Sequence, residues 1–313
     1  MTEQIKAVLS EVQKVVVGKD DVVNKVLTAI LASGHILLED VPGVGKTTLA
    51  LAFARAMDLD TRRVQFTSDT VPSDVMGVSI LDKQTGNFVY KPGAIMTNIL
   101  LADEINRTSS KTQSALLEAM EEGNVTVDGE TRPLPSPFVV LATQNPFGAA
   151  GTLLLPQSQL DRFMIRISMG YPNFASQVSI LKDRERSNPL ETVRRVVTRV
   201  ELLRAISEVN EEHVEPAIYE YITALTEATR SHPMVAMGVS PRGALMLCRM
   251  AKAKAYLSGQ DYVVPEDVAE AAPDVFGHRL ILNSKARFSE MDGRAVAAEV
   301  ILHVKMPVLK ALP

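Results

Sequence analysis

A Pro/Gly-rich turn carries the residues of this chain that are best suited to bind phosphate. The short apolar segment His35–Leu38 reads as a buried strand, and Lys46 opens an apolar helical pattern just beyond the turn. Gly43 and Gly45 let backbone N–H groups point inward around an anion, and the following helix adds the positive end of its dipole. The pattern therefore predicts a phosphate-binding loop, with a nucleotide held by Gly43, Val44, Gly45, Lys46, Thr47 and Thr48.

Asp40 departs from the usual phosphate-loop pattern. The motif Gly-x-x-x-x-Gly-Lys-[Ser/Thr] places a glycine where this chain has Asp40. A Gly-rich turn that only caps a helix is the alternative interpretation. A strand before the turn and Lys46-Thr47 after it favour the phosphate loop. Asp40 therefore raises a question about the geometry of the loop, but not about the class of site.

A second group of polar residues follows two further apolar strands. Asn98–Ala102 delivers Asp103 and Glu104 to its carboxyl end, and Phe138–Ala142 is followed closely by Asn145. Ligands of open α/β sheets bind at the carboxyl ends of the strands. Asp103 could hold Mg²⁺ together with the Thr47 hydroxyl, while Glu104 could deprotonate an attacking water that Asn145 orients. Two acids that merely solvate a loop, and an Asn-Pro turn, are the alternatives.

Strands that alternate with helices predict a parallel sheet covered on both faces in the first half of the chain. We expect helices over residues 2–17 and 20–32, the second one stopped by Gly34. Strands are expected at 63–66 and 163–167, a helix at 111–121, and a hairpin at 124–131 because Asp128-Gly129 is a strong turn pattern. Residues 67–90 read as a loop with a small insertion.

The second half of the chain is predicted to be helical. Strand patterns nearly vanish after Tyr171-Pro172, apart from the β-branched run Val193–Val197, and Thr198 with Glu201 forms a capping box. Pro273 is expected to break or kink its helix. Further helices are expected at 173–186, 198–210, 216–232, 241–258, 265–276 and 293–304.

Composition is that of an ordinary globular protein. The 313 residues carry 33 basic and 37 acidic side chains, so no basic field is present to attract nucleic acid or lipid. The single cysteine, Cys248, excludes an internal disulfide and fits a reducing compartment. The N-terminus is unlike a signal peptide, and the apolar run 26–38 is too short to span a membrane. We therefore expect a cytoplasmic protein with no membrane insertion.

Six motifs in a fixed order resemble the MoxR group of AAA+ ATPases. They are PGVGKT, LLADEINR, LLEAMEEGNVTVDGE, LATQNP, QLDRF and GVSPRG, and the resemblance extends over nearly the whole chain. It implies an α/β P-loop core with a five-stranded parallel sheet over residues 1–170 and a C-terminal all-α lid over 171–313. It also implies a homo-oligomeric ring, commonly a hexamer, that binds ATP and Mg²⁺ between subunits.

The resemblance assigns roles to individual residues. Lys46, Thr47, Asp103 and Glu104 match the Walker motifs, and Asn145 matches the first sensor. Arg162 matches an arginine finger that reaches the neighbouring subunit, although an Asp-Arg pair that closes a loop is an alternative. Arg242 matches the second sensor, acting within its own subunit or on the next one. Gly18 resembles part of the segment that packs against adenine, and Arg107 could face the interface.

The family resemblance implies an ATP-driven protein remodeller or chaperone that works with a partner carrying a von Willebrand factor A (VWA) domain. The ATPase subunit of a metal-chelatase-like complex is the alternative. A DNA-associated motor is disfavoured because the tip of the 124–131 hairpin carries Asp128 and Glu130 instead of basic residues. A switch that does not hydrolyse ATP is disfavoured by the intact Lys46, Asp103 and Glu104.

Overall fold

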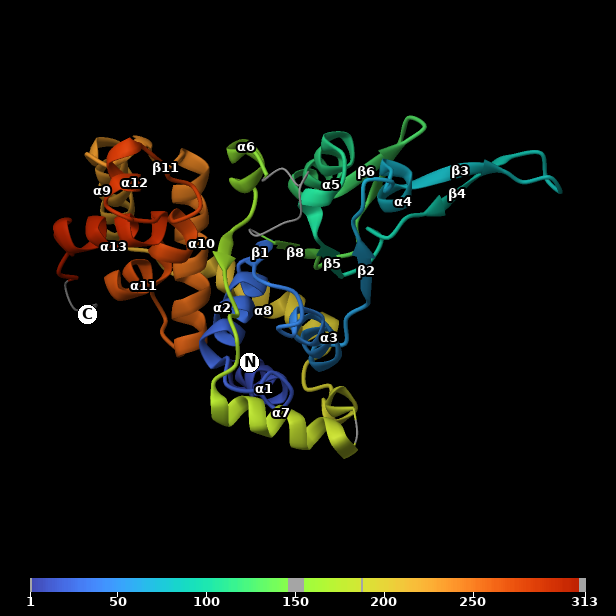
Figure 1. Cartoon of the computed structure of the whole chain (residues 1–313), viewed down its shortest axis with the longest axis horizontal. Helices are drawn as coiled ribbons and strands as arrows, with labels where there is room; N and C mark the ends of the chain where they lie inside the picture. The colour runs from blue at the N-terminus through green and yellow to red at the C-terminus, as the bar shows by residue number, and fades with distance from the viewer. Residues whose placement is uncertain (1, 146–154, 187, 310–313) are drawn as a thin grey trace.

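A five-stranded parallel sheet forms the centre of the protein, in the strand order β2-β5-β8-β1-β9 (Figure 1). The computed structural model describes residues 2–145, 155–186 and 188–309. All neighbouring strands run parallel, so their carboxyl ends lie along one edge, as predicted. The strands are β1 (Ile36–Glu39), β2 (Thr61–Gln65), β5 (Ile99–Asp103), β8 (Val139–Gln144) and β9 (Ile165–Ile167).

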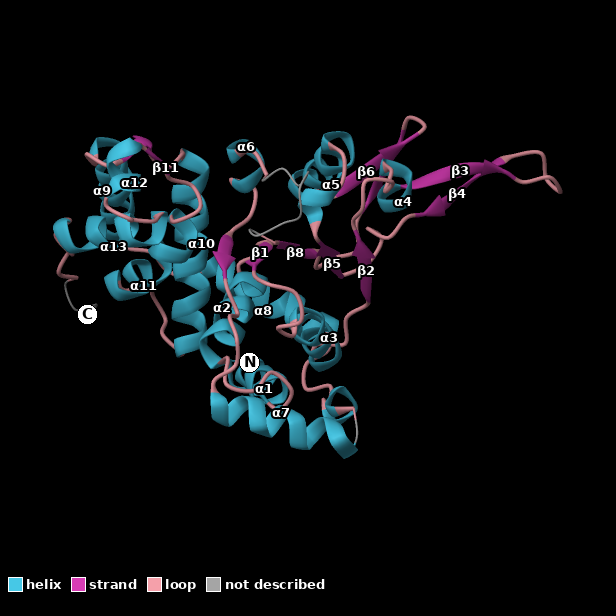
Figure 2. Ribbon diagram, in the orientation of Figure 1, coloured by secondary structure: helices cyan, strands magenta, loops and turns pink. Residues whose placement is uncertain are grey.

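Helices cover both faces of this sheet (Figure 2). Ile36 and Leu38 of β1 enter one apolar cluster, whereas Leu37 enters the cluster on the opposite face. Burial on both sides explains why these strands read as continuous apolar runs. The first cluster contains α1 (Thr2–Gln13), α2 (Asp20–Leu31) and α3 (Lys46–Ala56), and the second contains α4 (Pro72–Met76) and α5 (Ser110–Glu122).

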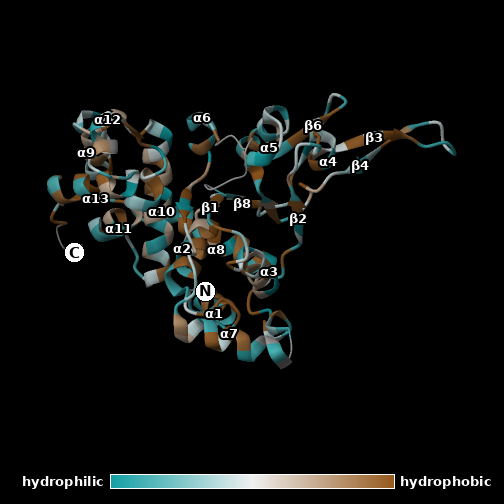
Figure 3. Ribbon diagram, in the orientation of Figure 1, coloured by the Kyte–Doolittle hydropathy of each residue, from teal (hydrophilic) through white to brown (hydrophobic). Residues whose placement is uncertain are grey.

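Two hairpins project from the second face. The pair β6 (Asn124–Val127) and β7 (Glu130–Pro133) turns at Asp128 and Gly129, whose φ angles of 52° and 80° confirm the predicted turn. The pair β3 (Gly77–Leu81) and β4 (Phe88–Pro92) lies in the region 67–90, which was expected to be a loop with a small insertion. The two strands were not located from the sequence because many of their apolar side chains are exposed to solvent. Strand β3 is coloured as hydrophobic in Figure 3.

The C-terminal lid is helical, with one small correction. Val235–Met237 (β10) pairs with Ile281–Leu282 (β11), so the all-helical expectation is wrong for this two-stranded sheet. Helix α11 continues through Pro273, so of the predicted break or kink the break is excluded. The lid helices are α9 (Pro216–Ser231), α10 (Pro241–Ser258), α11 (Pro265–Phe276), α12 (Ser284–Phe288) and α13 (Gly293–His303).

Helix α6 (Gln157–Leu160) lies between β8 and β9, whereas α7 (Phe174–Arg186) and α8 (Arg199–Glu211) follow β9 and lead to the lid. Thr198 caps α8 in the predicted capping box, accepting from the Glu201 N–H at 3.3 Å. Val193–Val197 forms no strand, because the N–H groups of Val196 and Val197 donate to the Ala56 carbonyl at the end of α3. Helix α8 packs against α2 and α10 alike, so the division at residue 170 stays a prediction.

The end of α2 differs from expectation in one residue. The left-handed conformation falls on Ser33 (φ 54°) rather than on Gly34. Gly34 is required for a different reason, since a Cβ there would lie 2.3 Å from the Met164 sulfur. No helix within the described ranges is both long enough and apolar enough to cross a membrane.

Candidate functional site

The phosphate loop has the backbone conformation that its glycines predict. Gly43 and Gly45 have φ angles of 86° and 99°, which strongly favour glycine. Gly45 caps the N-terminus of α3, and a Cβ on Gly43 would meet no atom within 4 Å. The loop is therefore an open cradle at the positive end of a helix, which fits an anionic phosphate chain.

Lys46 lies folded back onto this loop. Its ammonium donates to the carbonyls of Asp40 at 3.0 Å and Val41 at 3.3 Å. Burial lowers the pKa of Lys46, and the nearby carboxylates of Asp40, Asp103 and Glu104 oppose that change. The ammonium is held by two neutral acceptors that a phosphate could replace.

Asp103 and Glu104 lie at the carboxyl end of β5, as predicted. The buried Asp103 accepts from Arg63 Nε at 2.7 Å and from the Thr143 hydroxyl at 3.2 Å. Glu104 adopts a left-handed conformation with φ 55°, which costs a non-glycine residue about 1–3 kcal/mol. Its carboxylate accepts from Gln65 at 3.0 Å and from Arg107 at 2.6 Å.

These groups line one cleft of about 300 Å³ together with Asn145. Of the predicted site residues, the cleft contains Gly43, Gly45, Lys46, Thr47, Thr48, Asp103, Glu104 and Asn145. Pro146, which follows Asn145, is outside the described residues. Sequence reasoning missed Arg63 and Gln65, although their alternation at the end of β2 places both on the same face of the strand.

A second hollow of about 320 Å³ adjoins the cleft across Gly43 and Gly45. Its walls combine polar and apolar groups and include Val44 and the segment Val15–Val17. Gly18 has φ 71°, and a Cβ there would lie 2.1 Å from the Ser176 hydroxyl of α7. Gly18 thus allows α7 to approach, while its neighbours Val17 and Lys19 line the hollow. The phosphate loop thus separates two adjoining hollows.

Asp40 explains the departure from the usual loop pattern. Its buried carboxylate accepts from the backbone N–H groups of Met169 at 2.5 Å and Gly170 at 3.0 Å, and from the Ser168 hydroxyl at 2.9 Å. A glycine could make none of these hydrogen bonds. The side chain therefore ties the start of the phosphate loop to the segment after β9, which also contributes Met169 to the second hollow.

Arg162 and Arg242 lie away from this cleft and close to each other. They line a separate hollow of about 280 Å³ between α5, α10 and the end of α2. Glu121 of α5 pairs with both, at 3.0 Å from Arg162 Nε and in closer contact with Arg242 Nη2. Sequence reasoning did not single out Glu121, because nothing in the pattern of α5 distinguishes it from the adjacent Glu122.

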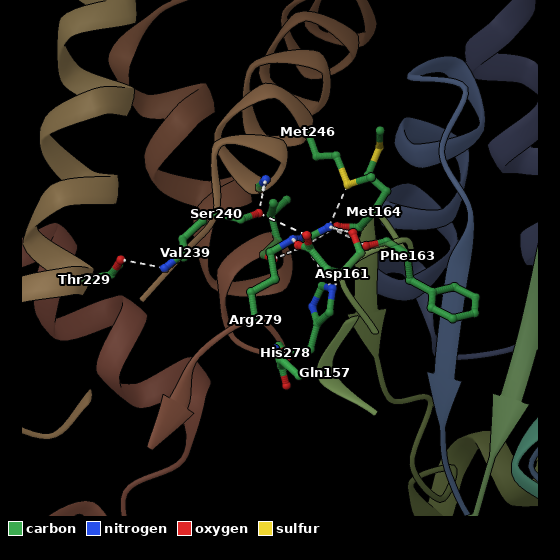
Figure 4. A network of polar contacts seen from close by, with 12 residues as sticks. Gln157, Asp161, Phe163, Met164, Thr229, Val239, Ser240, Met246, His278 and Arg279 are labelled. Carbon is green, nitrogen blue, oxygen red and sulfur yellow. Dashed lines mark hydrogen bonds and ion pairs between the residues drawn. The ribbon is translucent and has the colours of Figure 1, made fainter. Parts of the chain in front are cut away.

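A polar network joins the lid to the sheet next to these arginines (Figure 4). Asp161 accepts from Arg279 Nε at 2.8 Å and from the Ser240 hydroxyl at 3.0 Å. Burial lowers the pKa of Arg279 to about 10, and the Asp161 carboxylate opposes that change. The burial of Arg279 and His278 is a tertiary effect, and no spacing in the sequence indicated it.

The fold and the cleft define a nucleoside-triphosphatase with a phosphate loop and a helical lid. Residues 35–165 match the model of the ATPase family associated with various cellular activities (AAA), and residues 227–300 match the AAA lid domain. The AAA family implies ATP binding and ATPase activity.

Similar proteins narrow this class. The chain is 48% identical to the Bacillus subtilis (strain 168) protein YeaC over 303 residues, covering 97% of this chain and 95% of that protein. It is 38% identical to the chaperone MoxR1 of Mycobacterium tuberculosis over 318 residues, covering 99% and 84%. A crystal structure of a putative ATPase from Cytophaga hutchinsonii superposes with a TM-score of 0.92 at 40% identity, covering 98% and 96%. The chain belongs to the MoxR family of AAA ATPases.

Proposed function

We propose that this protein hydrolyses ATP at the interfaces between subunits of a homo-oligomeric ring, expected to be a hexamer. The observation that carries the proposal is the separation of the expected catalytic groups. Lys46, Asp103 and Glu104 line one cleft, whereas Arg162 and Arg242 line another hollow. A neighbouring subunit can therefore complete each site by supplying both arginines, and hydrolysis then depends on assembly.

Within this proposal each group has a defined role. Thr47 and Asp103 would hold Mg²⁺, which neutralises charge on the phosphates when bound. Lys46 binds the terminal phosphates, Asn145 orients the attacking water, and Glu104 accepts its proton. The hydrogen bonds from Gln65 and Arg107 both fall on Glu104 Oε2, so Oε1 is the oxygen that would accept from the water.

We further propose a chaperone or remodelling role in the maturation or activation of client proteins, with a VWA-domain protein as the partner. The relative named chaperone MoxR1 supports the chaperone role. The exposed apolar side chains of the β3–β4 hairpin, Leu81 and Phe88 among them, fit a protein surface. The acidic tip of the β6–β7 hairpin disfavours nucleic acid, and a cytoplasmic location stays part of the proposal.

The ATPase subunit of a metal-chelatase-like complex is the second candidate, since it shares the family resemblance. Copurification with a tetrapyrrole-binding subunit would favour it over a VWA-domain partner. A DNA-associated motor is less well supported. Binding to DNA with an affinity that falls steeply as the salt concentration rises would be evidence for it.

The test is the rate of ATP hydrolysis per subunit against protein concentration, with mass photometry of the same samples. We expect the rate to rise as rings form. Arg162→Ala should be inactive alone, yet regain activity when mixed with Glu104→Gln subunits, which supply the missing arginine. A flat rate from monomers would instead indicate a site that is complete within one subunit.

A further inference from the structure

Glu121 lies between the two arginines that the proposed function assigns to the neighbouring subunit's site. One carboxylate oxygen lies 3.0 Å from Arg162 Nε, and the other contacts Arg242 Nη2. In the described part of the chain no other carboxylate is within ion-pair distance of either arginine. We propose that Glu121 is a positioning residue that holds Arg162 of the sheet domain and Arg242 of the lid as one unit, and this rests on the proposed function.

The contacts leave both arginines able to bind a phosphate. A guanidinium has five N–H donors, and Glu121 engages Arg162 only at Nε and Arg242 only at Nη2. One negative charge between two positive ones also leaves the group cationic, and Arg249 lines the same hollow. Glu121 therefore reduces the repulsion between the two guanidinium groups without neutralising the site.

Arg162 is held by charge rather than by an aligned hydrogen bond. Its Nε is buried and has no hydrogen-bond partner among the described residues, although the Glu121 oxygen is 3.0 Å away. An ion pair tolerates rotation that a linear hydrogen bond does not. The side chain can thus turn toward a neighbouring subunit while it stays paired with Glu121.

The backbone that carries Glu121 is anchored to the sheet. The preceding residue, Met120, accepts through its carbonyl from His35 Nε2 at 3.0 Å, and His35 Nδ1 accepts from the Val140 N–H at 3.0 Å. His35 is buried and directly precedes β1. The carboxylate of Glu121 therefore extends from a point that is fixed relative to the central strands.

A second connection between the sheet and the lid runs through Asp161 and Ser240 (Figure 4). Asp161, which precedes Arg162, accepts from the hydroxyl of Ser240, and Ser240 caps helix α10 by accepting from the Gly243 N–H at 3.2 Å. Arg242 lies in the first turn of that helix. The two arginines are thus linked through Asp161 and Ser240 as well as through Glu121, so a movement of the lid would displace both.

The test removes the negative charge of Glu121 and keeps the shape of its side chain. Glu121→Gln should lower the kcat for ATP at least tenfold, leave the KM for ATP unchanged because the phosphate loop is intact, and still form rings by mass photometry. Mixing with Glu104→Gln subunits should restore activity above the mean of the two separate proteins. Glu122→Gln is the matched control, since Glu122 is exposed on the same turn and should retain wild-type kinetics.

Three outcomes would overturn the proposal. A wild-type kcat for Glu121→Gln, or a raised KM, would show that Glu121 does not act through the arginines. If Glu104→Gln restores the activity of Arg162→Ala but not that of Glu121→Gln, the role of Glu121 is rejected while the shared interface site is retained. Failure of both mixtures would reject the shared interface site and this proposal with it. If Glu121→Gln does not fold, Glu121→Asp replaces it in the test. Its shorter side chain should lower kcat in part without changing KM, and a wild-type kcat would reject the proposal.

Discussion

Arg63 Nε lies 2.7 Å from Asp103 Oδ2, the carboxylate that we expect to hold Mg²⁺. The two residues lie on neighbouring strands, with Arg63 two residues before the end of β2 and Asp103 at the end of β5. A cation on the protein and a metal ion would therefore compete for one carboxylate. The occupancy of the metal site then depends on whether Arg63 is paired.

Arg63→Gln should lower the Mg²⁺ concentration needed for half-maximal ATP binding. Arg63 is half exposed, so the ion pair contributes at most about 1 kcal/mol and the effect should be about two- to fivefold. Titration of Mg²⁺ against a fluorescent ATP analogue would measure it. Arg62→Gln is the control, because Arg62 donates to the Gly93 carbonyl instead. A higher Mg²⁺ requirement would mean that Arg63 contacts the nucleotide.

Lys46→Ala should weaken ATP binding roughly tenfold or more, since it removes a charged donor to phosphate. Isothermal titration calorimetry with ATP, and separately with adenosine, would show whether the loss is confined to the phosphates. Lys111→Ala, exposed at the start of α5, should bind as the wild type does. An unchanged affinity for ATP would contradict the assignment of the phosphate loop.

Asp40→Asn should destabilise the protein by about 2 kcal/mol, because the amide places an NH₂ group against backbone or hydroxyl donors in a buried site. Nucleotide affinity should fall as well, since Asp40 orders both the loop and residues 168–170. Urea unfolding and nucleotide titration are the measurements. Asp58→Asn is the control, because Asp58 makes only a half-exposed ion pair with Arg195. Equal stability of the two variants would refute the role of Asp40.

Stability should fall with acid because His35 is buried in its neutral form. Burial lowers the pKa of His35 to about 4 in the folded protein, against 6.5 for an exposed histidine. The contribution of neutral His35 to the free energy of unfolding is therefore fully present above pH 6.5 and is lost as the pH falls toward 4. The free energy of unfolding should be lower by about 2 kcal/mol at pH 5. Buried His278, beside Arg279, also has a lowered pKa and adds to this loss.

Urea unfolding at pH 7.5 and pH 5 would measure the effect of acid. His35→Gln should show a smaller loss between these two values, and exposed His303→Gln should match the wild type. A loss that His35→Gln leaves unchanged would assign the pH dependence to other groups.

Phe88→Ser should leave the unfolding free energy within about 0.5 kcal/mol of the wild type, because this side chain is 75% exposed. Basal ATP hydrolysis should also be unchanged, while binding to a VWA-domain partner should weaken at least tenfold. Surface plasmon resonance with the partner is the measurement, and Lys83→Ser at the same hairpin is the control. Wild-type binding by Phe88→Ser would remove the hairpin from the partner surface.

Local patterns were sufficient for much of the fold. Apolar runs on β1, β5 and β8 arise because these strands are buried on both faces, and the turn at Asp128-Gly129 follows from its left-handed backbone. An insertion was expected over residues 67–90, but its two strands were not located because they expose apolar side chains. Strands β10 and β11 were missed because they are too short for any periodicity.

The sequence by itself determined the phosphate loop, the acids at the end of β5 and the family, because each depends on residues that are near one another in the chain. Only the tertiary structure decided which partners these residues have. Asp40 meets residues 168–170, Asp103 meets Arg63, and Glu121 lies between Arg162 and Arg242. Such contacts join strands and helices that are distant in sequence, and their geometry follows from the strand order and the packing of the lid, which no local pattern contains.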